Sequence, residues 1–239
     1  MKKTFSIKQL FRDSTEDYKK YWGMFLMIGI IFVLVGFLTN MGSFQPHHAY
    51  GGGFRTGGSL FVTIIAWLLQ TFLTLGFIKM LLAMVDKKKV QLEQLFHGAN
   101  SFNHFLYFTV AMLLYSAIVG IGFVALIIPG IIFSVLFIFV QYLVAEEREG
   151  IFESFKRSIK MTKGNRWKIF WLMIVTILFN ILGLLALIIG LVITIPITYL
   201  VYTHLYRTLL KADSGQGEEA DTIIVEETII IETEPEPNK

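Results

Sequence analysis

The longest uncharged run of the chain extends from Phe105 to Ala145 and covers 41 residues, with a Pro129-Gly130 step in its second half. A membrane-spanning helix needs about 20 apolar residues, so this run is long enough for two crossings. Proline removes a backbone donor and glycine relaxes the backbone, so we expect the chain to reverse direction at Pro129-Gly130. A second uncharged run, Ile169 to Tyr206, covers 38 residues around Gly183 and Gly190. The sequence therefore predicts an all-α, polytopic transmembrane bundle.

Composition agrees with a chain that faces lipid. Hydrophobic residues make up 54% of the 239 and charged residues only 16%, which lies outside the usual range of soluble domains. The chain has no cysteine, which excludes a disulfide framework, a thiolate metal site and a cysteine nucleophile. Mostly polar residues separate Lys2 and Lys3 from the first apolar run, which indicates an uncleaved first helix rather than a signal peptide.

Six spans are predicted, paired into three hairpins. A short segment with apolar residues at helical spacing precedes each hairpin, and we expect each segment to be an amphipathic helix lying in the membrane interface. The strings that begin at Ser6, Gln91 and Gly150 resemble one another, which indicates a parallel three-fold repeat. The predicted transmembrane domain covers residues 1–212, with spans at about 21–38, 59–78, 105–127, 131–145, 168–187 and 190–206.

Positive charge predicts the orientation of these spans. Lys and Arg residues cluster before the first span, after the second, between the fourth and the fifth, and after the sixth, whereas the opposite loops hold Arg55 alone. Cytoplasmic loops carry such an excess, so we expect both termini to lie in the cytoplasm. Lys79 is then an interface anchor that extends toward the lysines at 87–89.

The charge also divides the chain into a basic body and an acidic tail. Residues 1–212 carry a net charge of +11 and residues 213–239 a net charge of −8. Basic residues beside membrane spans attract anionic lipid, so nucleic acid is not needed to explain a pI near 9.0. The tail has the composition of a disordered segment with two β-branched patches. Docking on the basic face, strand addition to a protein partner and a solvated tail without a partner all stay open.

The third amphipathic segment, Ile151 to Lys163, is the most basic of the three. We expect its Lys156, Arg157, Lys160 and Lys163 to face anionic headgroups.

Gln70, Gln141 and Asn180 lie inside predicted spans, one in each hairpin. Hydrogen bonding between helices, worth about 0.5–2 kcal/mol each, is one interpretation, and a polar cavity is the other. Gly29 with Gly36, and Ser116 with Gly120, have the spacing of close helix contacts.

Pro196 lies between Thr194 and Thr198 in the last span. We expect a kink there, with the threonine hydroxyls bonding to the carbonyls that proline leaves free.

No residue pattern points to catalysis, a cofactor or a metal. The five histidines are scattered, and His47 beside His48 is weak evidence for a metal site. We therefore assign no catalytic, cofactor-binding or metal-ligating residue.

Several short strings, in order along residues 85–211, resemble the family of bacterial six-helix proteins related to the membrane domain of glycerophosphoryl diester phosphodiesterases. The resemblance implies topology and location but no reaction, since the catalytic barrel of fused members has no counterpart here. The strings are Leu126 to Gly130, Glu146-Glu147, Glu153 to Ser158, Thr162 to Trp167 and Tyr206-Arg207.

The leading hypothesis from sequence is a non-enzymatic integral protein of the bacterial cytoplasmic (inner) membrane that acts through packing, lipid contact or assembly with partners. The alternative is a transporter of small molecules or lipids, which requires a hydrated cavity joining Gln70, Gln141 and Asn180. A membrane enzyme requires a cluster of titratable groups around one pocket.

Overall fold

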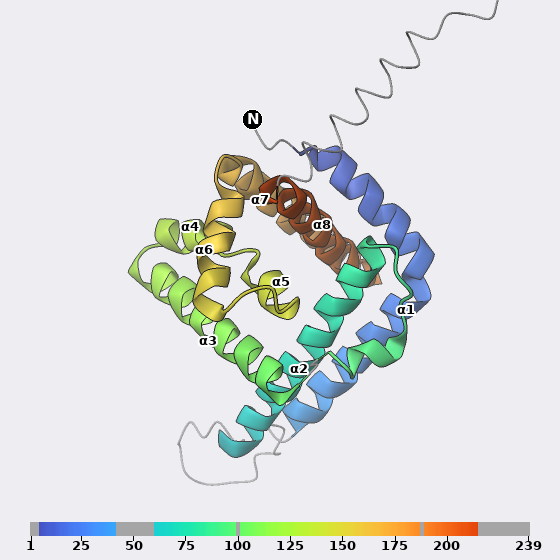
Figure 1. Ribbon diagram of the computed structural model, residues 1–239. Coiled ribbons are helices and arrows are strands. Elements are labelled where there is room, and N and C mark those ends of the chain that lie inside the picture. The colour runs from blue at the N-terminus through green and yellow to red at the C-terminus, as the bar shows by residue number, and fades with distance from the viewer. Residues whose placement is uncertain (1–4, 42–59, 99–100, 187–188, 215–239) are drawn as a thin grey trace, which may run out of the picture.

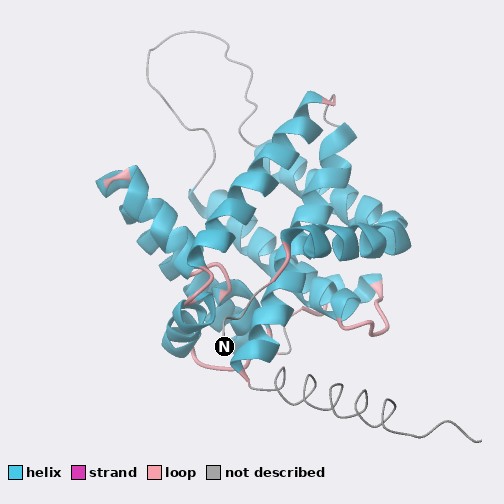
Figure 2. Cartoon of the chain, turned by 90° about the horizontal axis from the view of Figure 1, so that it is seen from above, coloured by secondary structure: helices cyan, strands magenta, loops and turns pink. Residues whose placement is uncertain are grey.

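The computed structural model describes residues 5–41, 60–98, 101–186 and 189–214, and in these the regular structure is helical (Figure 1). Helices and loops alone appear in the described part of the chain (Figure 2), which confirms the all-α class. The elements are α1 (Ile7–Met41), α2 (Leu60–Val85), the 3₁₀ helix η1 (Leu92–Leu95), α3 (Phe102–Ala125), α4 (Ile127–Leu136), α5 (Val140–Ala145), α6 (Ile151–Thr162), α7 (Arg166–Leu185) and α8 (Ile189–Asp213).

Among the residues that the structure describes, five helical segments are long and apolar enough to cross a membrane: Ile7–Phe37, Ile64–Val85, Phe102–Ala125, Ile127–Ala145 and Arg166–Leu185. Helix α8 is not among them. Its C-terminal half includes His204 and Arg207, which lower its mean hydropathy. The sixth predicted span, and with it the six-span arrangement, stays a prediction.

Helix α1 combines the first amphipathic segment and the first predicted span. The backbone leaves the helical region at Tyr21, with φ −113° and ψ 16°, which is the residue where that span was predicted to begin. Before this break, Leu10 and Ser14 are buried while Arg12 is exposed. The amphipathic segment therefore packs on protein with one face, and its partner is α8.

The three short segments pack in the same way around the bundle. Helix η1 contacts α2, α6 contacts α5, and the first half of α1 contacts α8, the last helix of the chain. Each segment thus lies on the second helix of a hairpin, and α1 closes the ring by meeting the hairpin farthest away in sequence (Figure 1).

The ends of the first two hairpins repeat at the level of single hydrogen bonds. After α2, the amides of Asp86, Lys87 and Lys88 bond to the carbonyls of Leu82, Met84 and Ala83, and φ of Lys87 is +54°. The amides of Glu146, Glu147 and Arg148 make the corresponding bonds after α5, and φ of Glu147 is +53°. Both are helix C-caps with a left-handed residue, which supports a repeated unit in these two hairpins.

The second amphipathic segment is not the α-helix expected from its pattern. Only Leu92–Leu95 form a single 3₁₀ turn. The reason is space: a Cβ placed on Gly76 of α2 would lie 2.0 Å from the carbonyl oxygen of Leu95, so the segment is pressed against the α2 backbone. An α-helix has a larger radius and would not fit at this distance.

The turn of the second hairpin lies at Leu126, not at Pro129-Gly130. Leu126 is extended, with φ −165° and ψ 149°, while Pro129 and Gly130 belong to the first turns of α4. Proline is tolerated there because amides of the first helical turn lack an intrahelical acceptor anyway. Gly130 serves close packing instead, since a Cβ on it would lie 2.5 Å from the Phe123 ring.

The fourth predicted span is broken in the middle. Helix α4 ends at Leu136 and α5 begins at Val140, which leaves backbone groups unpaired between them. Ser158 of α6 meets two of them: its hydroxyl donates to the Leu136 carbonyl at 2.7 Å and accepts from the Phe139 amide at 3.3 Å. A helix that is broken within the membrane needs such hydrogen-bond partners. Helix α6 is therefore packed into the bundle and does not lie only on the membrane surface.

Buried side chains concentrate in the C-terminal half of the second helix of each hairpin, a region called the hub here. It comprises residues 71–84 of α2, 135–145 of α4 and α5, and 197–210 of α8. The N-terminal halves of these second helices carry exposed apolar side chains, such as Ile65 of α2 and Ile193 of α8. The helices are thus held together at one end and offer apolar surface at the other.

Close helix contacts occur at glycines. At Gly29 and Gly120 an added Cβ would meet no other described element within 4 Å, and the packing predicted for these two positions and for Gly36 stays a prediction. Gly183 of α7 and Gly190 of α8 do meet: a Cβ on Gly190 would lie 2.4 Å from the Gly183 carbonyl oxygen. The spacing of small residues along a helix shows that a close helix contact is possible there. It does not show which face of the helix is turned to a neighbour.

Gly76→Ala tests the contact of α2 with η1. We expect a loss of about 1–3 kcal/mol in unfolding free energy, because the new methyl meets rigid backbone rather than a movable side chain. Thermal unfolding in detergent measures the effect. Gly120→Ala, where space is open, is the control and should be neutral or slightly stabilising; equal melting temperatures for the two variants would contradict the packing.

Candidate functional site

A cluster of charged side chains joins the hub ends of all three hairpins. Asp86 follows α2, Glu146 caps α5, and Arg207 lies in α8. Arg207 places Nη2 2.6 Å from Asp86 Oδ2 and 2.8 Å from Glu146 Oε1, and Nη1 3.0 Å from Glu146 Oε2. One guanidinium therefore binds one carboxylate from each of the other two hairpins, and its planar fork suits this geometry. These three residues, with Arg148 and Tyr206, form the hairpin-end cluster.

Glu146 is the most heavily bonded member of the cluster. Its Oε2 accepts from the Tyr206 hydroxyl and from Arg148 Nε, each at 2.7 Å, in addition to Arg207. Burial alone would raise the pKa of Glu146, but the hydrogen bonds from Arg148, Tyr206 and Arg207 outweigh it and hold the pKa below its ordinary value. Glu146 is therefore a carboxylate at neutral pH, and its charge is compensated inside the hub.

Sequence reasoning did not find this cluster. It used Glu146-Glu147 and Tyr206-Arg207 only as points of resemblance and did not single out Asp86. One feature of the sequence could have indicated it: in each hairpin, a charged residue stands at the same end of the second helix.

Arg207→Gln should destabilise the fold by about 3 kcal/mol, because it leaves two largely buried carboxylates without their shared cation. Thermal unfolding in detergent measures it, with Lys211→Gln one turn later as the exposed control.

The same cluster predicts how the free energy of unfolding decreases at acidic pH. The pKa of Glu146 is lower in the folded state than in the unfolded state, so the ionised carboxylate contributes to the free energy of unfolding. This contribution is present above the unfolded pKa of about 4.5 and is lost as the pH falls through the folded pKa. A Glu146→Gln variant that kept the full pH dependence below pH 4.5 would show that other groups cause it.

Three titratable side chains meet beside the cluster. His104 of α3 is buried; its Nε2 lies 3.1 Å from the Val144 carbonyl oxygen, and its Nδ1 lies 2.5 Å from Glu147 Oε1 and 3.5 Å from Lys79 Nζ. A carbonyl can only accept, so Nε2 carries a proton. The three side chains bring together α2, α3 and the loop that follows α5.

His104 and Glu147 also line a hollow of about 350 Å³, together with residues from the start of α3 and from the loop before α6, among them Ser101, Tyr107 and Glu149. The sequence prediction for Lys79 was incomplete. Lys79 is not only an interface anchor extending toward the following lysines, because its ammonium lies at His104. The sequence also gave no sign of a titratable cluster, since its members lie 25 and 43 residues apart along the chain.

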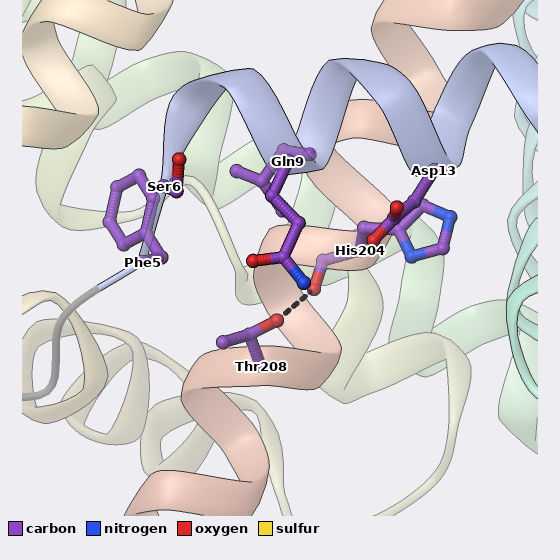
Figure 3. A pocket seen from close by; sticks show the side chains of 7 residues that line it. Phe5, Ser6, Gln9, Asp13, His204 and Thr208 are labelled. Atoms are coloured by element: carbon purple, nitrogen blue, oxygen red, sulfur yellow. Dashed lines mark hydrogen bonds between the residues drawn. The ribbon is translucent and has the colours of Figure 1, made fainter.

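A second polar hollow, of about 390 Å³, lies where α1 packs on α8 (Figure 3). Gln9 points toward Thr208, and Asp13 lies beside His204. His204 Nε2 lies 2.9 Å from Asp17 Oδ2, which ties the first helix to the last. The hollow belongs to the contact that closes the ring of hairpins.

The structure does not bring the predicted intramembrane polar residues together. Asn180 donates to the Thr176 carbonyl at 2.8 Å and to the Thr198 hydroxyl of α8 at 2.9 Å, so it bonds between helices. Gln70 is exposed on α2 and Gln141 is half-buried on α5. None of the three lines the hollows described here.

Helix α8 continues through Pro196. Thr198 donates to the Thr194 carbonyl at 2.8 Å, so this hydroxyl does not serve the carbonyl at residue 192 that lost its donor to proline. The role expected for Thr198 at the proline was therefore wrong.

The four basic residues predicted to face headgroups divide into two pairs. Arg157 is bound to Glu149 and lies 3.5 Å from the largely buried carboxylate of Asp213, and Lys160 lies 3.3 Å from the same carboxylate. Arg157 is therefore a structural ion-pair residue, and Asp213 belongs to α8 rather than to the tail. Lys156 and Lys163 are exposed, as are Arg166 and Lys168 at the start of α7. We call these four residues the basic face.

An apolar groove adjoins the basic face. It has a volume of about 360 Å³ and runs between α4, with Ile128, Ile132 and Leu136, and the start of α7, with Arg166 and Trp167. Trp167 is 70% exposed and stacks on Phe170 with ring centroids 5.3 Å apart. Exposed tryptophans of this kind are typical of the boundary between lipid and water.

These features define the class of the protein: its described residues form a helical bundle with five helical segments long and apolar enough to cross a membrane. Residues 58–211 match the uncharacterised protein family UPF0259, and the chain belongs to this family. Comparison with curated proteins and with solved structures gave no match. The family match carries no link to glycerophosphoryl diester phosphodiesterases, so that relation stays a prediction.

Proposed function

We propose that the chain is a non-enzymatic integral protein of the bacterial cytoplasmic membrane that binds anionic phospholipid through its basic face. In this proposal it crosses the membrane six times, with the hub and both termini on the cytoplasmic side. The proposal rests on the basic face itself: exposed Lys156 on α6, Lys163 at its C-cap, and Arg166 and Lys168 in the first turn of α7, close in sequence to the exposed Trp167 and Trp171.

The magnitudes favour a lipid partner. Each Lys or Arg near an anionic membrane surface contributes about 1 kcal/mol, so four together give a preference that is easily measured. Three acids near α6 and α7 are paired with other cations: Glu149 and Asp213 pair with Arg157 and Lys160, and Glu146 pairs with Arg207.

Removing the basic face tests the proposal. In the variant Lys156→Gln, Lys163→Gln, Arg166→Gln, Lys168→Gln, we expect the purified protein to lose its preference for phosphatidylglycerol over phosphatidylcholine, because four surface cations are gone. Native mass spectrometry of bound lipid measures it. The control exchanges each Lys for Arg and the Arg for Lys, keeps the charge and should keep the preference. A wild type without such a preference would end the proposal.

The orientation is tested by labelling. The chain has no cysteine, so single variants report one site each. Ser43→Cys should react with an impermeant maleimide from outside intact spheroplasts, and Lys88→Cys only after lysis, because the positive loops stay inside. Accessibility of Ser43→Cys from the cytoplasm alone would invert the topology.

A transporter of small molecules or lipids is the second candidate. Gln70, Gln141 and Asn180 do not support it as a set, but the Lys79, His104 and Glu147 trio does, since ionisable groups within apolar helices often form proton relays. If the protein moves phospholipid in a proton-linked manner, proteoliposomes should show pH-dependent exchange of a fluorescent phospholipid between leaflets, and His104→Gln should abolish it. Equal exchange with and without protein would exclude lipid transport.

The acidic segment after Asp213 lies outside the described residues apart from Ser214. A protein partner for this segment, or its docking on the basic face, stays a proposal.

A further inference from the structure

We infer that the groove between α4 and α7 is a binding site for one glycerophospholipid, with an acyl chain along α4 and the phosphate at Arg166. This inference rests on the proposed function and deepens it, because it assigns one-to-one binding to part of the basic face.

The shape and lining of the groove fit one acyl chain with a polar end. Its volume of about 360 Å³ lies within the range of small-ligand sites. Ile128, Ile132 and Leu136 form one wall, and Trp167 and Phe170 form the other. Arg166 is the charged residue of this lining, and it lies next to Trp167, whose exposed ring indicates headgroup depth. The groove therefore has a charged end at Arg166 and apolar walls along α4 and α7.

The apolar walls by themselves cannot select a ligand. Inside a membrane an acyl chain exchanges lipid neighbours for isoleucine side chains of similar polarity, so the hydrophobic contribution is close to zero. Selection must come from the polar end, where the planar guanidinium of Arg166 can bind two phosphate oxygens at once.

The start of α7 adds donors to this end. Asn165, the N-cap, makes no side-chain capping bond to the helix, so the first backbone amides of this 20-residue helix lack that partner. A helix N-terminus with unsatisfied amides favours phosphate. Lys163 and Lys168 flank it and favour an anionic headgroup.

Three variants of the full chain separate the parts of the site. Arg166→Gln removes the guanidinium, Arg166→Lys keeps the charge but not the planar fork, and Ile132→Trp fills the groove without changing charge. The controls are Arg12→Gln on α1 and Ile121→Trp on α3, both at exposed positions outside the groove. Thermal unfolding in detergent confirms that each variant is folded, and phosphatidylglycerol is titrated with detection by native mass spectrometry.

The wild type should bind one phosphatidylglycerol more tightly than all further ones. Arg166→Gln should weaken this first binding at least about tenfold, the usual cost of a lost hydrogen bond to a charged group. Arg166→Lys should weaken it less, and Ile132→Trp should abolish it while the weaker, salt-sensitive association stays. Both controls should bind as the wild type does.

Other outcomes overturn the inference in distinguishable ways. If Ile132→Trp keeps the tight binding, the groove is not the site, although the proposed function stands. Competition by millimolar inorganic phosphate would show a free-anion site and exclude the acyl part. If phosphatidylcholine binds one-to-one as tightly as phosphatidylglycerol, the groove stands but the proposed preference for anionic lipid fails.

Discussion

The pairing of Arg207 with Asp86 and Glu146 is the interaction on which the arrangement of the three hairpins depends. In lipid, apolar helices gain little by exchanging lipid for one another, so association depends on close packing and on polar contacts. One guanidinium that binds carboxylates from two other hairpins supplies such a contact and fixes their relative positions. The bonds from Tyr206 and Arg148 keep Glu146 charged, so the pairing operates at neutral pH.

A second constraint is the need to pair every backbone group away from water. The chain departs from regular helix at Tyr21, at Leu126 and between Leu136 and Val140. The last break is the most demanding, and Ser158 of α6 meets it with one hydroxyl that both donates and accepts. This explains why α6 is packed into the bundle: the segment that carries the basic residues also completes the broken helix.

Basic residues therefore have two different roles on α6 and α7. Arg157 and Lys160 neutralise Glu149 and Asp213 and hold the end of α8 in place. Lys156, Lys163, Arg166 and Lys168 are exposed, and these are the residues to which the lipid proposal is assigned. Ion pairing separates structural from surface cations in a way that their spacing along a helix does not show.

The amino-acid sequence by itself determined the class of the fold, the approximate limits of the apolar helices and the excess of positive charge, because these follow from local composition and period. It also located the break at Tyr21 and the amphipathic face of α6. The tertiary structure decided the rest. Leu126 rather than Pro129-Gly130 makes the turn, since proline costs little in a first helical turn. Likewise Asp86 meets Arg207, and Lys79 meets His104 and Glu147, only because residues far apart in the chain come together at the hub. Local pattern carries no information on which distant carboxylate a cation will reach, and so the charged clusters were beyond prediction from sequence.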